Sequence, residues 1–175
     1  LDAILRAGDR AQQYLAALRS VGTVPAARQH TDSHAFVAAL ADTANALCRP
    51  AKLHFVLQEQ WQGQFLCAAP ELSRALENML DNAVRYTPAG GTVTLTISKP
   101  EDTLVFTVTD TGPGFTPEAL HKAGQFLYTD AARPGNGHQG LGLYLARSVA
   151  QAYGGKLVLA NTGTGAQVQL CLPMQ

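Results

Sequence analysis

The stretch that decides the fold is LENMLDNAVRYTP, at Leu76–Pro88. It continues an apolar pattern that begins at Leu72 and keeps the helical period for about three and a half turns. Pro70 and Glu71 precede the pattern and suit the first turn of a helix. We therefore predict a strong amphipathic helix that packs firmly into the core. Its apolar face consists of Leu72, Ala75, Leu76, Met79, Leu80, Ala83 and Val84.

The same stretch places Asn78 and Asn82 four residues apart, and therefore on one face of the helix. Asparagine is a mediocre helix former, so a pair at this spacing needs a reason. A side-chain amide oxygen is a neutral, hard ligand, and a magnesium ion that also takes phosphate oxygens could accept one from each position. The alternative interpretation is a pair of solvated asparagines.

Further along the chain, Thr92–Ser98 and Leu104–Thr109 alternate apolar and polar residues around a polar link, which predicts an antiparallel hairpin. The same periodicities predict the other elements. They are a helix that starts at Asp32 or Ser33 and stops before Pro50, strands at Leu53–Leu57 and Gln64–Cys67, a helix at Leu141–Tyr153, and a closing hairpin of Lys156–Ala160 with Ala166–Leu172. This order predicts helices layered on one face of a mixed sheet.

One of these strands runs directly into a turn, DTGPG, at Asp110–Gly114. Glycines allow a backbone to come close to a ligand. An ionised carboxylate at the end of a strand can accept a hydrogen bond from an exocyclic amine such as that of adenine. The alternative is an ordinary Asp-Gly type of turn.

Residues 111–139 are rich in glycine, proline and polar residues, and they are too long for an ordinary connection, which favours a functional loop. The loop leads into GHQGLGL, at Gly137–Leu143. A glycine-rich entry to a helix presents unpaired N–H groups and the positive end of the helix dipole, and both attract phosphate. No Gly-Lys-Ser/Thr follows, so a nucleotide would be held by backbone groups and magnesium rather than by a P-loop lysine.

The beginning of the chain has a separate pattern. Apolar residues spaced by three and four over residues 1 to about 20 predict an amphipathic helix with a narrow seam, which requires a partner helix. Val24-Pro25 ends this helix, and the polar residues Gln29–Asp32 mark the expected boundary. We expect a helical part over 1–28 and the main domain over 29–175. Because the chain starts without methionine, we expect a fragment of a longer protein.

The composition excludes several classes of protein. A chain of 175 residues that is 46% hydrophobic can form a packed core, which excludes a disordered tail. Thirteen basic and thirteen acidic residues cancel, which disfavours nucleic-acid binding. No stretch approaches the roughly 20 apolar residues that span a bilayer, so we expect a soluble, intracellular chain. Cys48, Cys67 and Cys171 form no Cys-x-x-Cys pair, so we expect packed thiols rather than a disulfide framework or a zinc site.

In this order and spacing, the asparagine helix, the Asp110 turn and the glycine-rich run resemble the N, G1 and G2 boxes of the GHKL ATPase superfamily. The resemblance is greatest to the catalytic ATP-binding domain of bacterial sensor histidine kinases, and it covers residues 30–173. It implies an α/β two-layer sandwich, the Bergerat fold, with a mixed sheet covered by helices on one face. The N-terminal helical stub would be the end of a dimerisation hairpin. ATP would lie between the asparagine helix and a mobile lid over Phe115–Gln139.

The resemblance also implies a role for each site residue. Asn82 would be the principal magnesium ligand with Asn78 beside it, and Arg85 would reach toward phosphate; these are the implied catalytic residues. Tyr86 would pack over the adenine, and Asp110 would bind its amine. Glycines of the turn would leave room for the base, and the glycine-rich run would hinge the lid and donate backbone N–H groups to phosphate. The further ATP-binding residues implied are Gly112, Gly114, Phe126, Gly137, Gly140, Leu141 and Gly142.

One position separates the branches of this superfamily. In the gyrase, MutL and Hsp90 branch, a glutamate one turn before the metal-binding asparagine activates water. Here that place is Asn78, which cannot act as a base, and Glu77 is turned about 100° around the helix. A site without such a base suits transfer of the γ-phosphoryl group to another acceptor. Two positions depart from the family pattern: His138 replaces the usual first glycine of the G2 box, and Ala166 replaces a common threonine.

We therefore expect the kinase domain of a two-component sensor histidine kinase, which uses ATP and Mg²⁺. No histidine of the chain has the phosphoacceptor pattern, so the acceptor would lie outside it, on the parent's dimerisation domain. A response regulator receiver domain would take the phosphoryl group next, and the full-length protein would be a homodimer. We expect a cytoplasmic location, and anchoring of the parent in the inner membrane stays open. Two alternatives remain: a regulatory ATP-binding or protein-docking module without phosphoryl transfer, and an anti-sigma-type serine kinase.

Overall fold

The computed structural model describes residues 27–125 and 141–174. The helices in this part of the chain are α2 (Ser33–Cys48), α3 (Ala69–Tyr86), α4 (Pro117–Lys122) and α5 (Gly142–Ala152). The strands are β1 (Gln29–Asp32), β2 (His54–Glu59), β3 (Gln64–Cys67), β4 (Thr92–Ser98), β5 (Thr103–Asp110), β6 (Lys156–Asn161) and β7 (Ala166–Pro173).

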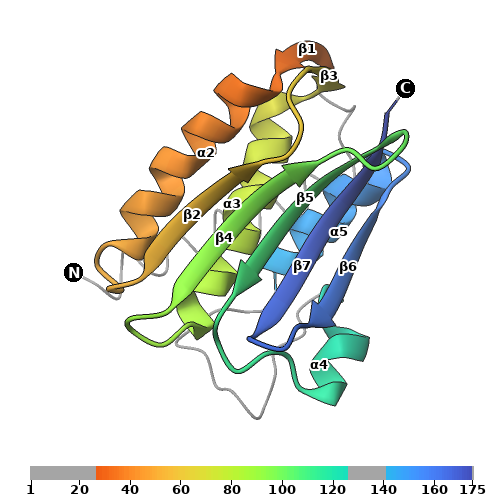
Figure 1. Cartoon of the computed structure of the whole chain (residues 1–175). Helices are drawn as coiled ribbons and strands as arrows, with labels where there is room; N and C mark the ends of the chain where they lie inside the picture. The colour runs from red at the N-terminus through yellow and green to blue at the C-terminus, as the bar shows by residue number, and fades with distance from the viewer. Residues whose placement is uncertain (1–26, 126–140, 175) are drawn as a thin grey trace, which may run out of the picture.

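The main sheet is mixed, and helices α2, α3 and α5 cover one of its faces, which confirms the predicted fold class (Figure 1). The strand order is β2-β4-β5-β7-β6. Strand β2 runs parallel to β4, and the other neighbours are antiparallel. The central strand β5 pairs Thr103 with Pro173 at one end and Asp110 with Val93 at the other. We call these two ends of the sheet the Thr103 end and the Asp110 end.

Helix α3 lies at the centre of the core. Its predicted apolar face is buried apart from the half-buried Val84, and Leu72, Leu76, Met79 and Leu80 are at 0% exposure. The helix packs against α2 and α5 and covers strands β4 and β5. Because each fully buried side chain of this size contributes about 1.5–3 kcal/mol, this face holds α3 firmly in place. Its polar residues are therefore presented at a fixed position.

Three aromatic rings join separate elements in the core. Phe36 of α2, Phe65 of β3 and Phe106 of β5 contact one another edge to face, with ring centroids 5.6–6.1 Å apart. Each such pair is worth about 0.5–1.5 kcal/mol beyond the area it buries. The cluster ties the small β1–β3 pair to the main sheet.

The start of the described chain differs from the prediction in one respect. Helix α2 begins as predicted, with the Asp32 carboxylate accepting a hydrogen bond from the N–H of Ala35 at 2.9 Å. Residues Gln29–Asp32, however, form a strand that pairs antiparallel with β3. Their side chains are almost all exposed, so the strand has no apolar alternation by which it could be predicted. The predicted helix over residues 1–20 lies outside the described residues, and the division into 1–28 and 29–175 stays a prediction.

The predicted functional loop contains a short helix, α4. Its N-cap residue, Thr116, accepts a hydrogen bond from a backbone N–H in the first turn at 3.1 Å. Arg147 of α5 donates to the carbonyl of Ala123, at the end of α4, at 3.1 Å. Helix α5 therefore holds the first part of the loop, and residues 126–139 of the predicted lid lie outside the described residues.

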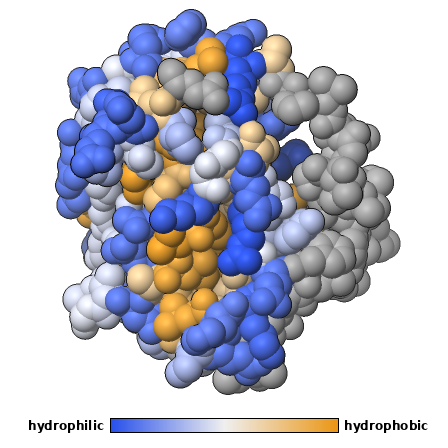
Figure 2. All heavy atoms as spheres, turned by 90° about the vertical axis from the view of Figure 1, so that its right-hand side faces the viewer, coloured by the Kyte–Doolittle hydropathy of each residue, from blue (hydrophilic) through white to orange (hydrophobic). Residues whose placement is uncertain are grey.

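Strand β6 forms one edge of the sheet. Its middle residues Val158, Leu159 and Ala160 are half-buried, and Lys156 and Asn161 at its ends are exposed. Figure 2, which views this side of the molecule, shows hydrophobic residues gathered in one area among polar ones. A charged residue on an edge strand disfavours pairing with another sheet.

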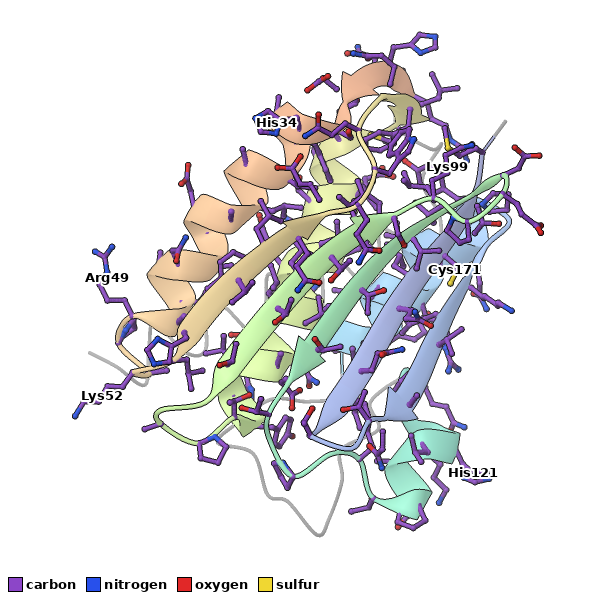
Figure 3. All side chains as sticks on the ribbon, in the orientation of Figure 1. His34, Arg49, Lys52, Lys99, His121 and Cys171 are labelled. Carbon is purple, nitrogen blue, oxygen red and sulfur yellow. The ribbon has the colours of Figure 1, made fainter. Side chains whose placement is uncertain are left out.

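The cysteines are free thiols, and Cys48 and Cys67 are buried. Burial raises the pKa of all three thiols, which keeps them protonated and unreactive at neutral pH. Figure 3 shows Cys171 on β7 and places His34 and His121 far apart, on α2 and α4. In the described residues no cluster of three or more His, Cys, Asp or Glu side chains could hold a metal ion. No helix in the same residues has the length and apolar character needed to cross a membrane.

Candidate functional site at the Asp110 end

The turn after β5 lies against the C-terminal end of α3. A Cβ atom at Gly112 would lie 2.7 Å from the carbonyl oxygen of Tyr86, so this approach requires glycine. Tyr86 itself is half-buried. The first two elements of the predicted site, the asparagine helix and the Asp110 turn, are thus in direct contact.

Helix α5 begins beside the asparagine helix. A Cβ atom at Gly142, the first residue of α5, would lie 3.6 Å from both Cβ and Oδ1 of Asn78. The N-cap residue Leu141 is 2% exposed and provides no side-chain hydrogen bond to the first turn. A helix N-terminus without a side-chain cap is a natural anion site, because its N–H groups and its dipole both favour negative charge. The structure therefore brings the start of α5 to the predicted metal-binding face of α3.

Asn78 holds a polar atom that the fold leaves unsatisfied. Within the described residues, its Nδ2 is the one buried side-chain nitrogen or oxygen without a hydrogen-bond partner. An unmade hydrogen bond of this kind costs about 1–3 kcal/mol, and native proteins seldom keep one without a functional reason. The unsatisfied Nδ2 can donate to an anion, and the Oδ1 of the same amide, which lies toward Gly142, can bind a cation.

The other polar residues of α3 lie on the following turns. Asn82 is half-buried, one turn beyond Asn78 on the same face. Arg85 donates to the Asp81 carboxylate, with Nη2 and Oδ2 2.6 Å apart and side chains that are 20% and 46% exposed. A partly exposed ion pair of this type contributes little to stability and exchanges partners readily. The predicted reach of Arg85 toward phosphate requires it to leave Asp81.

Asp110 is buried at the end of β5, with 7% exposure. Its Oδ1 accepts hydrogen bonds from the N–H of Gly112 at 2.8 Å and from the N–H of Ala166 at 3.2 Å. Two donors on one oxygen fix the orientation of the carboxylate. Ala166, which has no polar side chain, thus contacts the carboxylate through its backbone.

The structure adds one residue that the sequence did not single out. Asn161, the last residue of β6, accepts from the N–H of Phe115 at 2.6 Å and donates to the carbonyl of the same residue at 2.9 Å. Gly114, just before, has a φ of +75°, a conformation that favours glycine. An asparagine at the end of a strand is only a weak signal, and its partner lies 46 residues away in the sequence.

Part of the predicted site lies outside the described residues. These positions are Phe126, Gly137 and Gly140. The structure does bring together Asn78, Asn82, Gly112, Asp110 and Gly142 at one end of the sheet, and the roles assigned to them remain predictions.

The donor set fits a magnesium ion held partly by a nucleotide. Asn78 and Asn82 place two side-chain amide oxygens on one face of α3, and the Nδ2 of Asn78 can donate to a phosphate oxygen. Amide oxygens are hard ligands, and Mg²⁺ usually takes only one or two protein groups and completes its shell with water and phosphate oxygens. The absence of a carboxylate and histidine cluster in the described residues does not oppose such a site.

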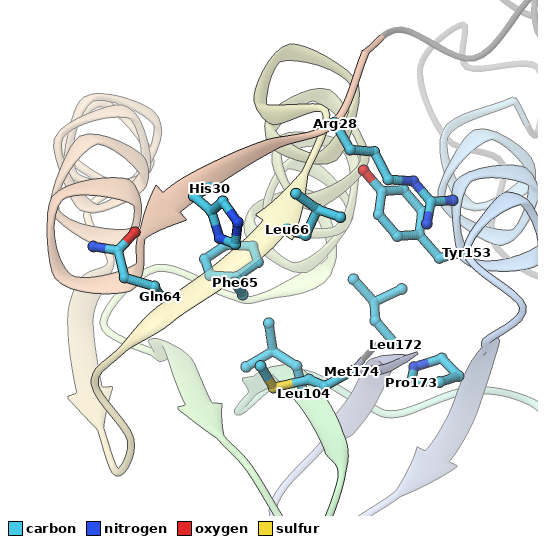
Figure 4. A pocket seen from close by; sticks show the side chains of 10 residues that line it. All are labelled: Arg28, His30, Gln64, Phe65, Leu66, Leu104, Tyr153, Leu172, Pro173 and Met174. Carbon is cyan, nitrogen blue, oxygen red and sulfur yellow. The ribbon is translucent and has the colours of Figure 1, made fainter.

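A groove at the opposite, Thr103 end contains none of the predicted site residues (Figure 4). Arg28 and Tyr153 lie together at one side of it, with the guanidinium 4.1 Å from the centre of the ring. The remaining lining residues are His30, Gln64, Phe65, Leu66, Leu104, Leu172, Pro173 and Met174. This groove is separate from the candidate nucleotide site.

Comparison with known families gives one match that covers more than half of the chain. The family described as "Histidine kinase-, DNA gyrase B-, and HSP90-like ATPase" matches residues 67–175. This range contains the asparagine helix, the Asp110 turn and the start of α5.

Curated relatives are sensor kinases. The chain is 42% identical over 106 residues to Sensor histidine kinase SpaK of Bacillus subtilis, a match that covers 59% of this chain and 23% of that protein. It is 38% identical over 94 residues to Sensor protein QseC of Escherichia coli, a match that covers 54% of this chain and 20% of that protein. It is 36% identical over 105 residues to Histidine protein kinase DivJ of Caulobacter vibrioides, a match that covers 59% of this chain and 18% of that protein. The chain therefore spans less than a quarter of the length of these relatives.

Solved structures share the fold. A mycobacterial sensor histidine kinase, MprB, superposes with a TM-score of 0.73 at 23% identity, over 84% of this chain and 99% of that one. Full-length ShkA, solved in complex with AMPPNP, superposes with a TM-score of 0.78 at 22% identity, over 99% of this chain and 38% of that one. These likenesses confirm the α/β sandwich.

Proposed function

Because the chain belongs to the family of histidine kinase-, DNA gyrase B- and HSP90-like ATPases, we propose that it binds magnesium-ATP at the Asp110 end of its sheet. It acts there as the kinase domain of a two-component sensor histidine kinase. The names of its relatives support this proposal, as does the presence of an ATP analogue in the ShkA complex.

The observation that carries the proposal is the orphaned amide of Asn78 beside the uncapped start of α5. The Nδ2 of Asn78 and the first N–H groups of α5 are hydrogen-bond donors without side-chain partners, and phosphate oxygens can accept from both. The Oδ1 of the same amide remains available to a magnesium ion that accompanies the phosphates.

Each group of the site then has a distinct task. Asn82 and Asn78 would hold the magnesium ion, which when bound neutralises charge on the triphosphate. The first N–H groups of α5, from Gly142 onward, donate to phosphate oxygens. Asp110, oriented by its two backbone donors, accepts a hydrogen bond from the adenine amine. Arg85 exchanges its Asp81 partner for phosphate.

The chemistry that suits this arrangement is transfer rather than hydrolysis. Asn78 cannot take a proton from water, and Glu77 is exposed on another side of α3. The nucleophile is instead an imidazole nitrogen of a histidine outside this chain. Its lone pair forms a bond to the γ-phosphorus, the bond to the bridging oxygen of ADP breaks, and the ring proton passes to solvent.

The wider partners follow from the same proposal. The acceptor histidine belongs to the dimerisation domain of the parent protein, which is a homodimer in its full-length form. A receiver domain of a response regulator then takes the phosphoryl group. We place this domain in the cytoplasm, where ATP is available.

A phosphoryl-transfer assay tests the proposal. The chain is incubated with magnesium and γ-labelled ATP, alone and together with the parent's histidine-bearing helical hairpin as a separate protein. We expect label on the hairpin only, and we expect acid to remove it, because phosphohistidine is acid-labile. Asp110→Asn should abolish both nucleotide binding and labelling.

Other outcomes would identify the alternatives. Acid-stable label on a serine would indicate the anti-sigma type of kinase. Nucleotide binding without label on the hairpin would indicate a regulatory or docking module. Label on this chain alone would contradict an acceptor outside it.

A further inference from the structure

The turn between β6 and β7 supports both ends of the Asp110 turn. At the start of the Asp110 turn, the N–H of Ala166 donates to the carboxylate of Asp110 at 3.2 Å. At its end, Asn161 binds the backbone of Phe115 through both its oxygen and its nitrogen. Residues 110 and 115 are therefore held by two neighbouring points of one hairpin, since Asn161 pairs with Ala166.

This hairpin turn is rigid through its own hydrogen bonds. The N–H of Thr162 donates to the carbonyl of Gly165 at 2.8 Å. The Thr162 hydroxyl accepts from the N–H groups of Gly165 at 3.0 Å and of Thr164 at 3.2 Å. Because the donors and acceptors of the turn are used internally, it offers Asn161 a fixed base.

The amide of Asn161 matches the backbone of Phe115 in both polarity and position. Its Oδ1 lies 2.6 Å from the Phe115 nitrogen, and its Nδ2 lies 2.9 Å from the Phe115 oxygen. A Cβ atom at Gly114 would lie 2.8 Å from the same Oδ1, so the turn passes directly over the amide. Asn161 is an exposed residue, and burial in the core therefore does not explain its contacts.

We propose that Asn161 is a positioning residue for recognition of the nucleotide base, acting through the Asp110 turn. This inference rests on the proposed function. By fixing Phe115, Asn161 limits the paths that the backbone of the turn can take, and so keeps the Asp110 carboxylate aligned with the base. Without it, the Asp110 carboxylate keeps its backbone donor from Ala166, but the turn that carries its second donor, Gly112, is less restrained.

The test measures base preference, because a loss of overall stability does not change it. The probes are ATP and inosine triphosphate, which differ in the group at position 6 of the base and in the proton on the adjacent N1. Adenine presents a donor amine at position 6, and hypoxanthine presents an acceptor oxygen that repels a carboxylate. In the wild-type chain with magnesium, we expect about a tenfold or greater preference for ATP in equilibrium binding.

In Asn161→Ala we expect this preference to fall about threefold or more, while circular dichroism shows a folded chain. Asn161→Asp is the second variant: it keeps an acceptor for the Phe115 N–H but turns a second oxygen toward the Phe115 carbonyl, so its preference should fall as well. Asn45→Ala is the matched control, since Asn45 also donates its amide to a backbone carbonyl, that of Ala41, at 2.9 Å. It lies on α2, and we expect it to keep the wild-type ratio.

The outcomes separate this inference from the proposed function. If both Asn161 variants keep the wild-type preference, or lose affinity for the two nucleotides equally, the positioning role is wrong and the proposed function stands. If the wild-type chain binds neither nucleotide, the proposed function fails, and the inference falls with it. If either folded variant loses preference and Asn45→Ala does not, the inference is supported.

Discussion

The two ends of helices α3 and α5 differ in how their polar groups are satisfied. At the Thr103 end, where α3 begins and α5 ends, the Tyr153 hydroxyl accepts from the N–H of Ala68 at 2.7 Å, and Arg28 donates to the carbonyl of Ala152 at 2.8 Å. At the Asp110 end, the amide of Asn78 is orphaned, and α5 starts without a side-chain cap. Helix α5 is thus closed at its C-terminal end and open at its N-terminal end, where it lies beside the unsatisfied amide in the middle of α3.

This difference separates stability from binding. Paired groups at the Thr103 end hold the helices in place: the Arg28 guanidinium also lies over the Tyr153 ring, and a cation is favoured at the negative end of α5. Burial raises the pKa of Tyr153, so its hydroxyl stays neutral. Unpaired groups at the Asp110 end cost stability and are available to a ligand. Variants at the Thr103 end should therefore lower the free energy of unfolding and keep nucleotide affinity. Variants at the Asp110 end should weaken nucleotide binding and keep or raise the free energy of unfolding.

The largest effect is expected at the open end. Asn82→Ala should weaken binding of a magnesium-loaded ATP analogue about a hundredfold or more, equivalent to about 3 kcal/mol, because it removes the principal metal ligand of the proposed site. Titration calorimetry measures the affinity, and urea unfolding of the nucleotide-free chain should give nearly the wild-type midpoint. An Asn82→Ala chain with a lower urea midpoint and wild-type affinity for the analogue would contradict a binding role for this end.

The next effect is expected at the closed end. Tyr153→Phe leaves the buried N–H of Ala68 without an acceptor, which should lower the free energy of unfolding by about 1–3 kcal/mol. Nucleotide affinity should change less than about twofold, since the ring and its contact with Arg28 remain. Urea unfolding and calorimetry on the same sample give both numbers. Loss of affinity without loss of stability would show that the two ends are not separate in function.

Removal of the unsatisfied Asn78 amide should raise stability and weaken binding at the same time. Asn78→Leu removes an orphaned amide and keeps a side chain of similar length. The free energy of unfolding of the nucleotide-free chain should therefore rise by about 1 kcal/mol. Binding of the magnesium-loaded analogue should weaken in the same variant. Asn45→Ala, which removes a satisfied amide, should show no such gain. A less stable Asn78→Leu chain with normal binding would mean that the amide serves the fold and not a ligand.

The smallest effect concerns a pair between α2 and β2 that lies at the Thr103 end of the sheet but takes no part in the Tyr153 contacts. His34 bonds the Glu59 carboxylate at 2.9 Å, and this hydrogen bond and charge raise the pKa of His34 above its usual 6.5. A raised folded pKa means that the stabilisation is complete below pH 6.5 and is lost as pH rises through the folded value. The difference in thermal midpoint between wild type and His34→Ala should thus be larger at pH 5.5 than at pH 8. Glu59→Gln should remove this pH dependence.

The sequence was sufficient where the signal is local. The helical period of Leu72 to Val84 and the alternation of Thr92–Ser98 predicted α3 and β4 because burial of one face leaves a pattern in neighbouring residues. Strand β1 escaped prediction because it is polar and exists through its pairing with β3. Helix α4 was missed because its six residues lie within a loop rich in glycine and proline.

The site shows the same limit. Asn78, Asn82 and Asp110 stood out because each is an unusual residue in its own local pattern. Asn161 and Tyr153 did not, since their partners Phe115 and Ala68 lie 46 and 85 residues away. Contacts of this range depend on the completed fold and leave no periodic trace in the sequence.

The central claim is that one nucleotide contacts the face of α3 that carries Asn78 and Asn82, the end of β5 at Asp110, and the start of α5. Two-dimensional NMR of the labelled chain, titrated with a magnesium-loaded non-hydrolysable ATP analogue, tests it most directly. We predict that the side-chain amides of Asn78 and Asn82 and the backbone amides of Gly112 and Gly142 shift together along one binding curve, while Ala68 and Ala152 stay in place. Shifts confined to a single one of these segments, or located at the Thr103 end, would contradict the account.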